Sequence, residues 1–237
     1  MNDIPRWRRA NGPQTFGQHR SVVDPMRAGN LVDLYDATTW YWDSRFYRGV
    51  YQRSYSVLFD KLDRRGWLRD RGSPLRVVDC GIGTGLLTTS LINTIDRRLD
   101  LSGVDTSPGM LEHARARLRC AGTEPRLMLA DISHLPFEDR EMDLVMAALV
   151  LEHVPKPPDA LREMVRIAGP NATLLLIATR RGAPDWPFRL WFQYQPFAKD
   201  RVVRWMTEAG IRNICVEPLT GAARPFARAY IGAASGR

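Results

Sequence analysis

Apolar and polar residues alternate along this chain in two patterns that predict two kinds of element. Short runs rich in Val, Ile and Leu are typical of strands buried on both faces, whereas apolar residues that recur every three or four positions are typical of helices. The predicted strands lie around Val77-Val78 and at Leu99–Asp105, Leu127–Ala130, Asp143–Leu151, Thr173–Thr179, Ile211–Val216 and Ala227–Ala233. The predicted helices between them are Leu86–Ile95, Leu111–Cys120, Asp159–Ala168 and Asp200–Ala209, with Gly169-Pro170 ending the third. This order predicts an α/β fold with a doubly wound, mostly parallel sheet.

Three segments depart from this alternation. Residues 1–30 are rich in Pro and Gly and poor in apolar residues, which predicts a mobile arm. Residues 31–73 have helical spacing and many aromatic residues, so we expect an N-terminal helical cap. Residues 74–237 then form the main domain, interrupted at about 180–200 by an insertion of aromatic, Pro and Arg residues that is expected to act as a lid.

Composition narrows the class of protein. A chain of 237 residues with 44% hydrophobic content is long enough for one sizeable core. Its longest apolar run, Leu144–Leu151, is far shorter than the roughly 18 residues of a membrane span, so no transmembrane segment is expected. The three cysteines, Cys80, Cys120 and Cys215, form neither a metal pattern nor a disulfide framework. We therefore expect no metal site and a reducing, cytoplasmic location.

Charge is unevenly distributed along the chain. The net charge of +8 divides into +5 for residues 1–73, −3 for residues 74–179 and +6 for residues 180–237. Basic flanks are compatible with nucleic acid, with an anionic surface or with an anionic small substrate. A solvated, Arg-rich surface without a partner is an equally good interpretation, so charge alone does not select among them.

A glycine-rich loop follows the first predicted strand and carries the clearest chemistry. Asp79 precedes Gly81, Gly83 and Gly85, which permit positive φ and let a ligand lie against the backbone. A dinucleotide fingerprint needs Gly or Ala at the sixth position, where this chain has Leu86, and the Lys of a phosphate-binding loop is absent. A carboxylate here would repel a pyrophosphate but attract an ammonium or sulfonium. S-adenosylmethionine carries both cations and no phosphate, although an ordinary strand-to-helix turn is the alternative.

This run resembles the first motif of class I S-adenosylmethionine-dependent methyltransferases, whose glycine loop wraps the methionine part of the cofactor. Three further segments resemble later motifs of that family in the same order: Asp105-Thr106-Ser107-Pro108-Gly109-Met110, Ala130-Asp131-Ile132 and Leu151-Glu152-His153-Val154. The resemblance covers roughly residues 31–235 and is nearest to the small-molecule type, the ubiquinone/menaquinone methyltransferase-like group. It implies a Rossmann-like seven-stranded sheet with an antiparallel last strand.

The resemblance also implies a cofactor site. An acid at the end of the second strand, here Asp105, can accept hydrogen bonds from both ribose hydroxyls in a doubly wound fold. In the family, Met110 would lie against the adenine, Asp131 would accept from its amino group and Ile132 would pack on the ring. The implied cofactor-binding residues are Asp79, Gly81, Gly83, Gly85, Asp105, Thr106, Met110, Asp131, Ile132 and Ala147.

Residues for the acceptor are expected in the cap, in the lid and after the fourth strand. His153 is the candidate catalytic base, with orientation of its loop as the alternative role. The aromatic lid suggests a flat or lipophilic small-molecule acceptor, while a homodimer contact or packing on the core explains the same residues. The candidate substrate-binding residues are Tyr41, Trp42, His153, Trp186 and Arg189.

Two other functions fit the same fold. Amino-group nucleic-acid methyltransferases carry an Asn- or Asp-Pro-Pro-aromatic run where this chain has Ala147-Ala148-Leu149-Val150, and no Cys lies in a loop suited to cytosine chemistry. A nucleic-acid partner is therefore not expected. A cyclase, or a protein that binds the cofactor without transferring a methyl group, stays open. The acceptor, and whether its reacting atom is oxygen, nitrogen or carbon, are not fixed by the sequence.

Overall fold

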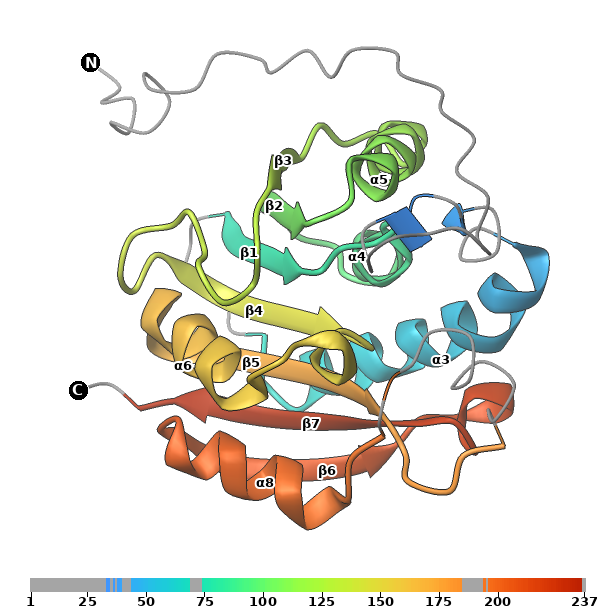
Figure 1. Cartoon of the computed structure of the whole chain (residues 1–237). Helices are drawn as coiled ribbons and strands as arrows, with labels where there is room; N and C mark the ends of the chain where they lie inside the picture. The colour runs from blue at the N-terminus through green and yellow to red at the C-terminus, as the bar shows by residue number, and fades with distance from the viewer. Residues whose placement is uncertain are drawn as a thin grey trace, which may run out of the picture.

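The chain forms one seven-stranded sheet with helices on both faces (Figure 1). The structure is a computed structural model that describes residues 33, 34, 36, 38, 39, 44–68, 74–184, 194 and 196–235. The strand order is β3-β2-β1-β4-β5-β7-β6. The strands are β1 (Leu75–Cys80), β2 (Leu99–Asp105), β3 (Arg126–Leu129), β4 (Met142–Ala148), β5 (Ala168–Thr179), β6 (Ile211–Pro218) and β7 (Ala227–Ala234).

The pairing of the strands confirms the predicted fold class. Strands β1 to β5 pair in parallel, and β7 lies antiparallel between β5 and β6. The order reverses between β1 and β4, so the crevice at the switch point opens at the carboxyl ends of these strands. The helices are α3 (Arg45–Arg64), α4 (Leu86–Ile92), α5 (Pro108–Cys120), α6 (Pro157–Ile167) and α8 (Lys199–Glu208), with 3₁₀ turns η3 (Leu151–His153) and η4 (Gly221–Ala223).

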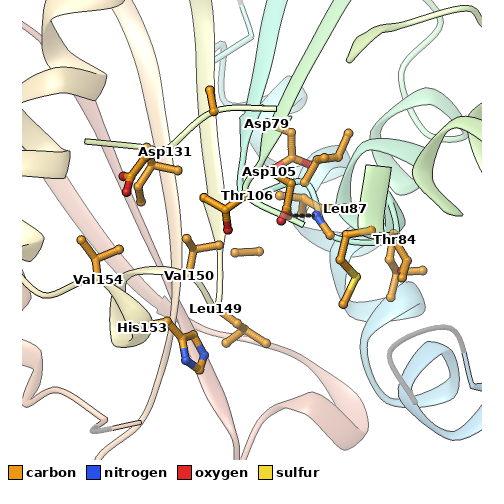
Figure 2. A pocket seen from close by; sticks show the side chains of 18 of the residues that line it. Asp79, Thr84, Leu87, Asp105, Thr106, Asp131, Leu149, Val150, His153 and Val154 are labelled. Carbon is orange, nitrogen blue, oxygen red and sulfur yellow. Dashed lines mark hydrogen bonds between the residues drawn. The ribbon is translucent and has the colours of Figure 1, made fainter. Parts of the chain in front are cut away.

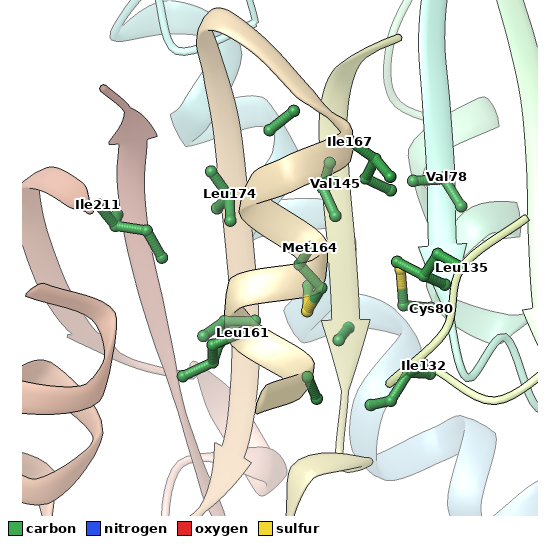
Figure 3. Packing of buried hydrophobic residues seen from close by; sticks show 14 of the residues in the cluster. Val78, Cys80, Ile132, Leu135, Val145, Leu161, Met164, Ile167, Leu174 and Ile211 are labelled. Carbon is green, nitrogen blue, oxygen red and sulfur yellow. The ribbon is translucent and has the colours of Figure 1, made fainter. Parts of the chain in front are cut away.

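Strands buried on both faces explain the unbroken apolar runs of the sequence. Neighbouring residues on one strand point into different cores: Val78 belongs to the core on the side of α6 and α8, whereas Val77 belongs to the core on the side of α3 and α4. Figure 3 shows α6 lying across β4 and β5, with Leu161, Met164 and Ile167 directed at the sheet. On the opposite face, α3 and α4 supply the covering apolar side chains. Helix α3 is thus part of the main core.

The predicted end of β4 and the predicted start of β5 are wrong, each for a backbone reason. Strand β4 ends at Ala148 instead of Leu151, because Leu149 has a positive φ of 57° and turns the chain into η3. Strand β5 begins at Ala168, directly after α6, although Gly169-Pro170 was expected to separate helix from strand. A register shift between Met142 and Leu144 absorbs this irregular start, and Asn171 takes a positive φ of 59°.

One arginine fixes the loop after β3, which contributes to the crevice. Arg166 of α6 donates from its guanidinium to the carbonyl oxygens of Leu135 at 3.0 Å and Phe137 at 2.9 Å. It also pairs with Glu163 at 2.8 Å and Asp139 at 2.7 Å. A planar guanidinium with five donors is suited to such a clamp.

Within the described ranges, no helix combines the length and apolar character needed to cross a membrane.

We predict that Leu161→Ala destabilises the fold by about 2–5 kcal/mol, because the fully buried side chain leaves a cavity between α6 and the sheet. Val57→Ala on α3 is the control: this side chain is 41% exposed, and its loss should change stability by less than about 0.5 kcal/mol. Urea unfolding of both variants measures the difference. A cost below about 1 kcal/mol for Leu161→Ala would contradict the described packing.

Candidate active site

A cavity of about 340 Å³ opens where β1, β2 and β4 end, at the switch point of the sheet. Figure 2 shows Asp79 and Asp105 on one side of it and His153 with Val154 on the other. Eight of the ten predicted cofactor-binding residues line this cavity, namely Asp79, Gly81, Gly83, Asp105, Thr106, Met110, Asp131 and Ile132. Residues far apart in the sequence therefore line the same cavity.

The other two predicted residues lie beside the cavity without lining it. Gly85 is the left-handed N-cap of α4, with φ of 78°, and a Cβ there would lie 3.4 Å from the Ala114 backbone of α5. Ala147 is 2% exposed and belongs to the core under α6, so its neighbour Ala148 faces the cavity instead. Gly85 shapes the loop, and Ala147 packs the strand beneath it.

The glycine loop needs glycine for two different reasons. At Gly81, φ is 73° and an added Cβ would come within 2.4 Å of Val150 Cγ2, so the loop after β4 packs directly on its backbone. At Gly83, φ is 53° and no atom lies within 4 Å of an added Cβ. The backbone at Gly83 is thus open to the cavity, where a ligand could lie against it.

Asp105 joins the glycine loop to the loop after β2. Its Oδ2 accepts from the Gly83 N–H at 2.8 Å, and its Oδ1 accepts from the Ser107 N–H at 2.9 Å. Burial raises the pKa of the carboxyl, and these backbone N–H groups partly offset that rise. The two contacts fix the plane of a carboxylate that lines the cavity and can accept further hydrogen bonds.

Asp79 is a buried carboxyl at the end of β1. It is 1% exposed, and its Oδ2 accepts from the Thr88 hydroxyl at 2.6 Å. Burial raises the pKa of Asp79 to about 7, with the charge of Asp105 adding to the rise. A cation bound in the cavity would stabilise the ionised form and lower this pKa.

The loop after β3 supplies one polar and one apolar residue to the cavity. Ile132 is 4% exposed and packs on the core, whereas Asp131 is exposed and its Oδ1 accepts from the Ser133 N–H at 2.7 Å. His134 is exposed and donates its backbone N–H to the Asp131 carbonyl, as expected of a loop residue. A flat ring with an amino group would find an acceptor and an apolar wall here.

His153 lines the cavity from the end of η3. Its ring centroid lies 5.4 Å from that of Tyr194, with the planes tilted by 59°. Burial lowers the pKa of His153 to about 4, so the imidazole is neutral at pH 7. The buried Glu152 accepts from the Thr179 N–H and so ties η3 to the end of β5. His153 is therefore held as a neutral hydrogen-bonding group and a weak base.

Sequence reasoning missed residues of α3 that line the cavity. Tyr47 and Tyr55 both face it, and together with Tyr51 they form a ladder with ring centroids 4.8 and 5.6 Å apart. Their i, i+4, i+8 spacing was visible in the sequence, but it does not reveal which core the helix stripe meets. Tyr41, Trp42, Trp186 and Arg189, the other predicted substrate-binding residues, lie outside the described residues.

The part of the chain that the structure describes contains no group of three His, Cys, Asp or Glu residues arranged to hold a metal ion. Its three cysteines are free thiols, and Cys80 and Cys215 have pKa values raised by burial. The cavity therefore presents carboxylates, aromatic hydroxyls and one imidazole as its ionisable groups.

Several known proteins that resemble this chain in sequence or in fold are methyltransferases. Residues 78–176 match the family described as a methyltransferase domain. The malonyl-[acyl-carrier protein] O-methyltransferase of Halorhodospira halophila is 35% identical over 44% of this chain and 35% of its own length. The ubiquinone/menaquinone biosynthesis C-methyltransferase of Azotobacter vinelandii is 34% identical over 43% of this chain and 41% of its own length. The chain thus spans less than half the length of these relatives.

A solved structure shows the same architecture over nearly the whole domain. Magnesium protoporphyrin IX methyltransferase from Synechocystis PCC 6803 superposes with a TM-score of 0.68 at 17% identity, covering 86% of this chain and 98% of that one. The fold is therefore that of the Rossmann-like methyltransferases. Within this fold, residues 78–176 carry the sequence pattern of a methyltransferase domain, which the relatives above share.

We predict that stability of the ligand-free protein depends on the titration of Asp79. Its folded pKa of about 7 exceeds the ordinary 3.8, so the folded state binds the proton more tightly, and this stabilisation is lost as the pH rises through 7. Asp79→Asn removes that titration while keeping an acceptor for Thr88. The melting temperature of the variant, relative to wild type, should therefore rise between pH 5 and pH 8.

His153 acts in the opposite direction, because its lowered pKa makes stability rise with pH between about 4 and 6.5. Comparing Asp79→Asn with wild type at each pH cancels this contribution, since both proteins retain His153. Thermal unfolding followed by circular dichroism measures the two curves. A melting-temperature difference that stays constant between pH 5 and pH 8 would contradict the raised pKa.

Proposed function

We propose that this chain transfers the methyl group of S-adenosylmethionine to a small aromatic or lipophilic acceptor and releases S-adenosylhomocysteine. The observation that carries the proposal is Asp105, whose two oxygens are held by backbone N–H groups of two loops at the switch point. A carboxylate fixed there is suited to a ribose. The described lining of the cavity also holds two further carboxyls, Asp79 and Asp131, and no basic side chain other than His153, which favours a cationic ligand over a phosphate.

Each part of the cofactor has residues of fitting chemistry. Asp105 would accept from the ribose hydroxyls, and Ile132 with Met110 would enclose the adenine next to the Asp131 carboxylate. The exposed backbone at Gly83 would take the methionine part, with its ammonium on the side of Asp79. Bound S-adenosylmethionine supplies an electrophilic methyl group on a sulfonium. The residues of the chain bind, orient and shield it from water.

The acceptor would lie against the loop after β4 and the ladder of α3. Leu149, Val150 and Val154 give this side an apolar wall, and the neutral His153 and the hydroxyls of Tyr47 and Tyr55 are its polar groups. An apolar wall with a few polar groups favours a flat or lipophilic molecule bearing an oxygen or nitrogen. The relative named for ubiquinone/menaquinone biosynthesis supports an acceptor of this kind.

Methyl transfer requires little acid–base chemistry from the protein. The nucleophile attacks in line with the bond that breaks, so holding both reactants in that geometry supplies most of the rate. Where the acceptor atom bears a proton, the neutral imidazole of His153, which lines the cavity, would receive it. Its low pKa makes it a weak base, so we propose orientation and desolvation as the main contributions.

We predict that Asp105→Asn weakens binding of S-adenosylhomocysteine on the order of 100-fold, because hydrogen bonds to a charged acceptor contribute about 1.5–3 kcal/mol each. Asp100→Asn is the matched control, since Asp100 lies on the same strand but is exposed. Isothermal titration calorimetry measures both affinities. Equal affinities for wild type and Asp105→Asn would exclude the ribose assignment.

We predict that the protein, supplied with S-adenosylmethionine carrying a labelled methyl group, labels small lipophilic acceptors from a panel of quinols, phenols, carboxylic acids and amines. RNA should stay unlabelled. Binding of the cofactor without label in any acceptor would favour a non-transferring or cyclase function, and label confined to RNA would favour nucleic-acid modification. Thin-layer chromatography with scintillation counting distinguishes these outcomes.

A further inference from the structure

A carboxylate of the N-terminal cap contacts the beginning of α5, about seventy residues away in sequence. Asp36 Oδ1 accepts from the Ser107 hydroxyl and from the Gly109 N–H, the latter at 3.1 Å. Asp36 lies within a turn that Thr38 closes, donating from its backbone N–H at 3.1 Å and from its hydroxyl at 2.7 Å to the Leu34 carbonyl. Asp36 is half-buried in this position.

The contact matters because Ser107 also touches the cofactor site. Ser107 is 1% exposed and is the N-cap of α5, with its Oγ accepting from the Met110 N–H at 3.0 Å. Its own backbone N–H donates to Asp105 Oδ1 at 2.9 Å. The Ser107 hydroxyl therefore accepts from the helix and donates its proton to Asp36, while the Ser107 backbone N–H holds Asp105.

We infer that Asp36 is a positioning residue for the ribose site: it fixes Ser107, and Ser107 fixes the Asp105 carboxylate. This inference rests on the proposed function of the cavity. Asp36 is placed to act in this way because it satisfies one of the N–H groups that a helix leaves unpaired at its first turn, and a negative charge there is favourable. Removing it frees the loop that presents the Ser107 amide.

A second observation shows how closely the N-terminal cap segment packs against the beginning of α5. A Cβ added at Gly109 would lie 2.9 Å from Asp36 Oδ1 and 3.5 Å from Thr39 Cγ2. Gly109 has no positive φ, so alanine would otherwise favour the helix at this position. The absence of a side chain is what lets the cap segment approach α5. Burial is the main cause of the raised pKa of Asp105, and the Asp36 charge adds to it, as expected of neighbouring carboxylates.

The first test is a double-mutant cycle read out as the affinity for S-adenosylhomocysteine. Asp36→Ala should weaken binding about tenfold. If Asp36 acts through Asp105, the double variant Asp36→Ala/Asp105→Asn should bind within twofold of Asp105→Asn alone. Asp36→Asn keeps an oxygen that accepts both hydrogen bonds, so it should stay within threefold of wild type. If Asp36→Ala instead disturbed the fold as a whole, it would weaken S-adenosylhomocysteine binding by the same factor in the wild-type and the Asp105→Asn backgrounds.

The second test uses sterics and keeps the Asp36 charge. Gly109→Ala should weaken binding several-fold by displacing the carboxylate, even though alanine favours the helix. Gly49→Ala is the matched control: Gly49 lies within α3, and no atom lies within 4 Å of an added Cβ. Affinity unchanged by Gly109→Ala, or reduced equally by Gly49→Ala, would overturn the inference.

The third test needs no cofactor, so it separates this inference from the proposed function. In the ligand-free protein, amide hydrogen exchange of Gly109 should accelerate at least tenfold in Asp36→Ala and stay near wild type in Asp36→Asn. If wild type fails to bind S-adenosylhomocysteine, the proposed function fails, and exchange still tests the contact. Unchanged Gly109 exchange, additive effects in the cycle, or Asp36→Ala affinity within twofold of wild type would each overturn the role of Asp36.

Discussion

The site depends on one carboxylate held by the backbone of two loops. Parallel strands bring their carboxyl ends to one edge of the sheet, and Asp105 at the end of β2 accepts from the loop that follows β1 and from the loop that begins α5. Because both donors are backbone N–H groups, the geometry is set by the fold and not by flexible side chains. The glycine loop, the α5 N-cap residue Ser107 and the N-terminal cap residue Asp36 are arranged around this single carboxylate.

The second constraint is electrostatic. Burying Asp79 without a cationic partner is costly, and the cost appears as a pKa raised to about 7. A ligand that brings a positive charge offsets this cost, which gives the site a preference for cations that shape alone does not provide. The opposite wall is apolar around a neutral imidazole, so one end of the cavity is suited to charge and the other to a lipophilic molecule.

Local pattern was sufficient to predict the sheet and most of the residues that line the cavity at the ends of β1, β2 and β3, but not those that reach it from the N-terminal cap. Asp79, Gly81 and Gly83 lie within one short segment, so the geometry of this loop follows from the local sequence. Tyr55 and Asp36 reach the site from the cap through tertiary packing, and helix periodicity does not say which surface a stripe meets. The end of β4 was misplaced because Leu149 adopts a positive φ that apolar residues rarely take.

The most direct measurement is a crystal structure of the protein with S-adenosylhomocysteine. The ribose hydroxyls should lie at about 2.7 Å from the Asp105 oxygens. The adenine should lie against Ile132, and the ammonium should lie on the side of Asp79. A ligand bound elsewhere, or bound in this cavity with its ribose turned away from Asp105, would contradict the assignment on which the whole site is built.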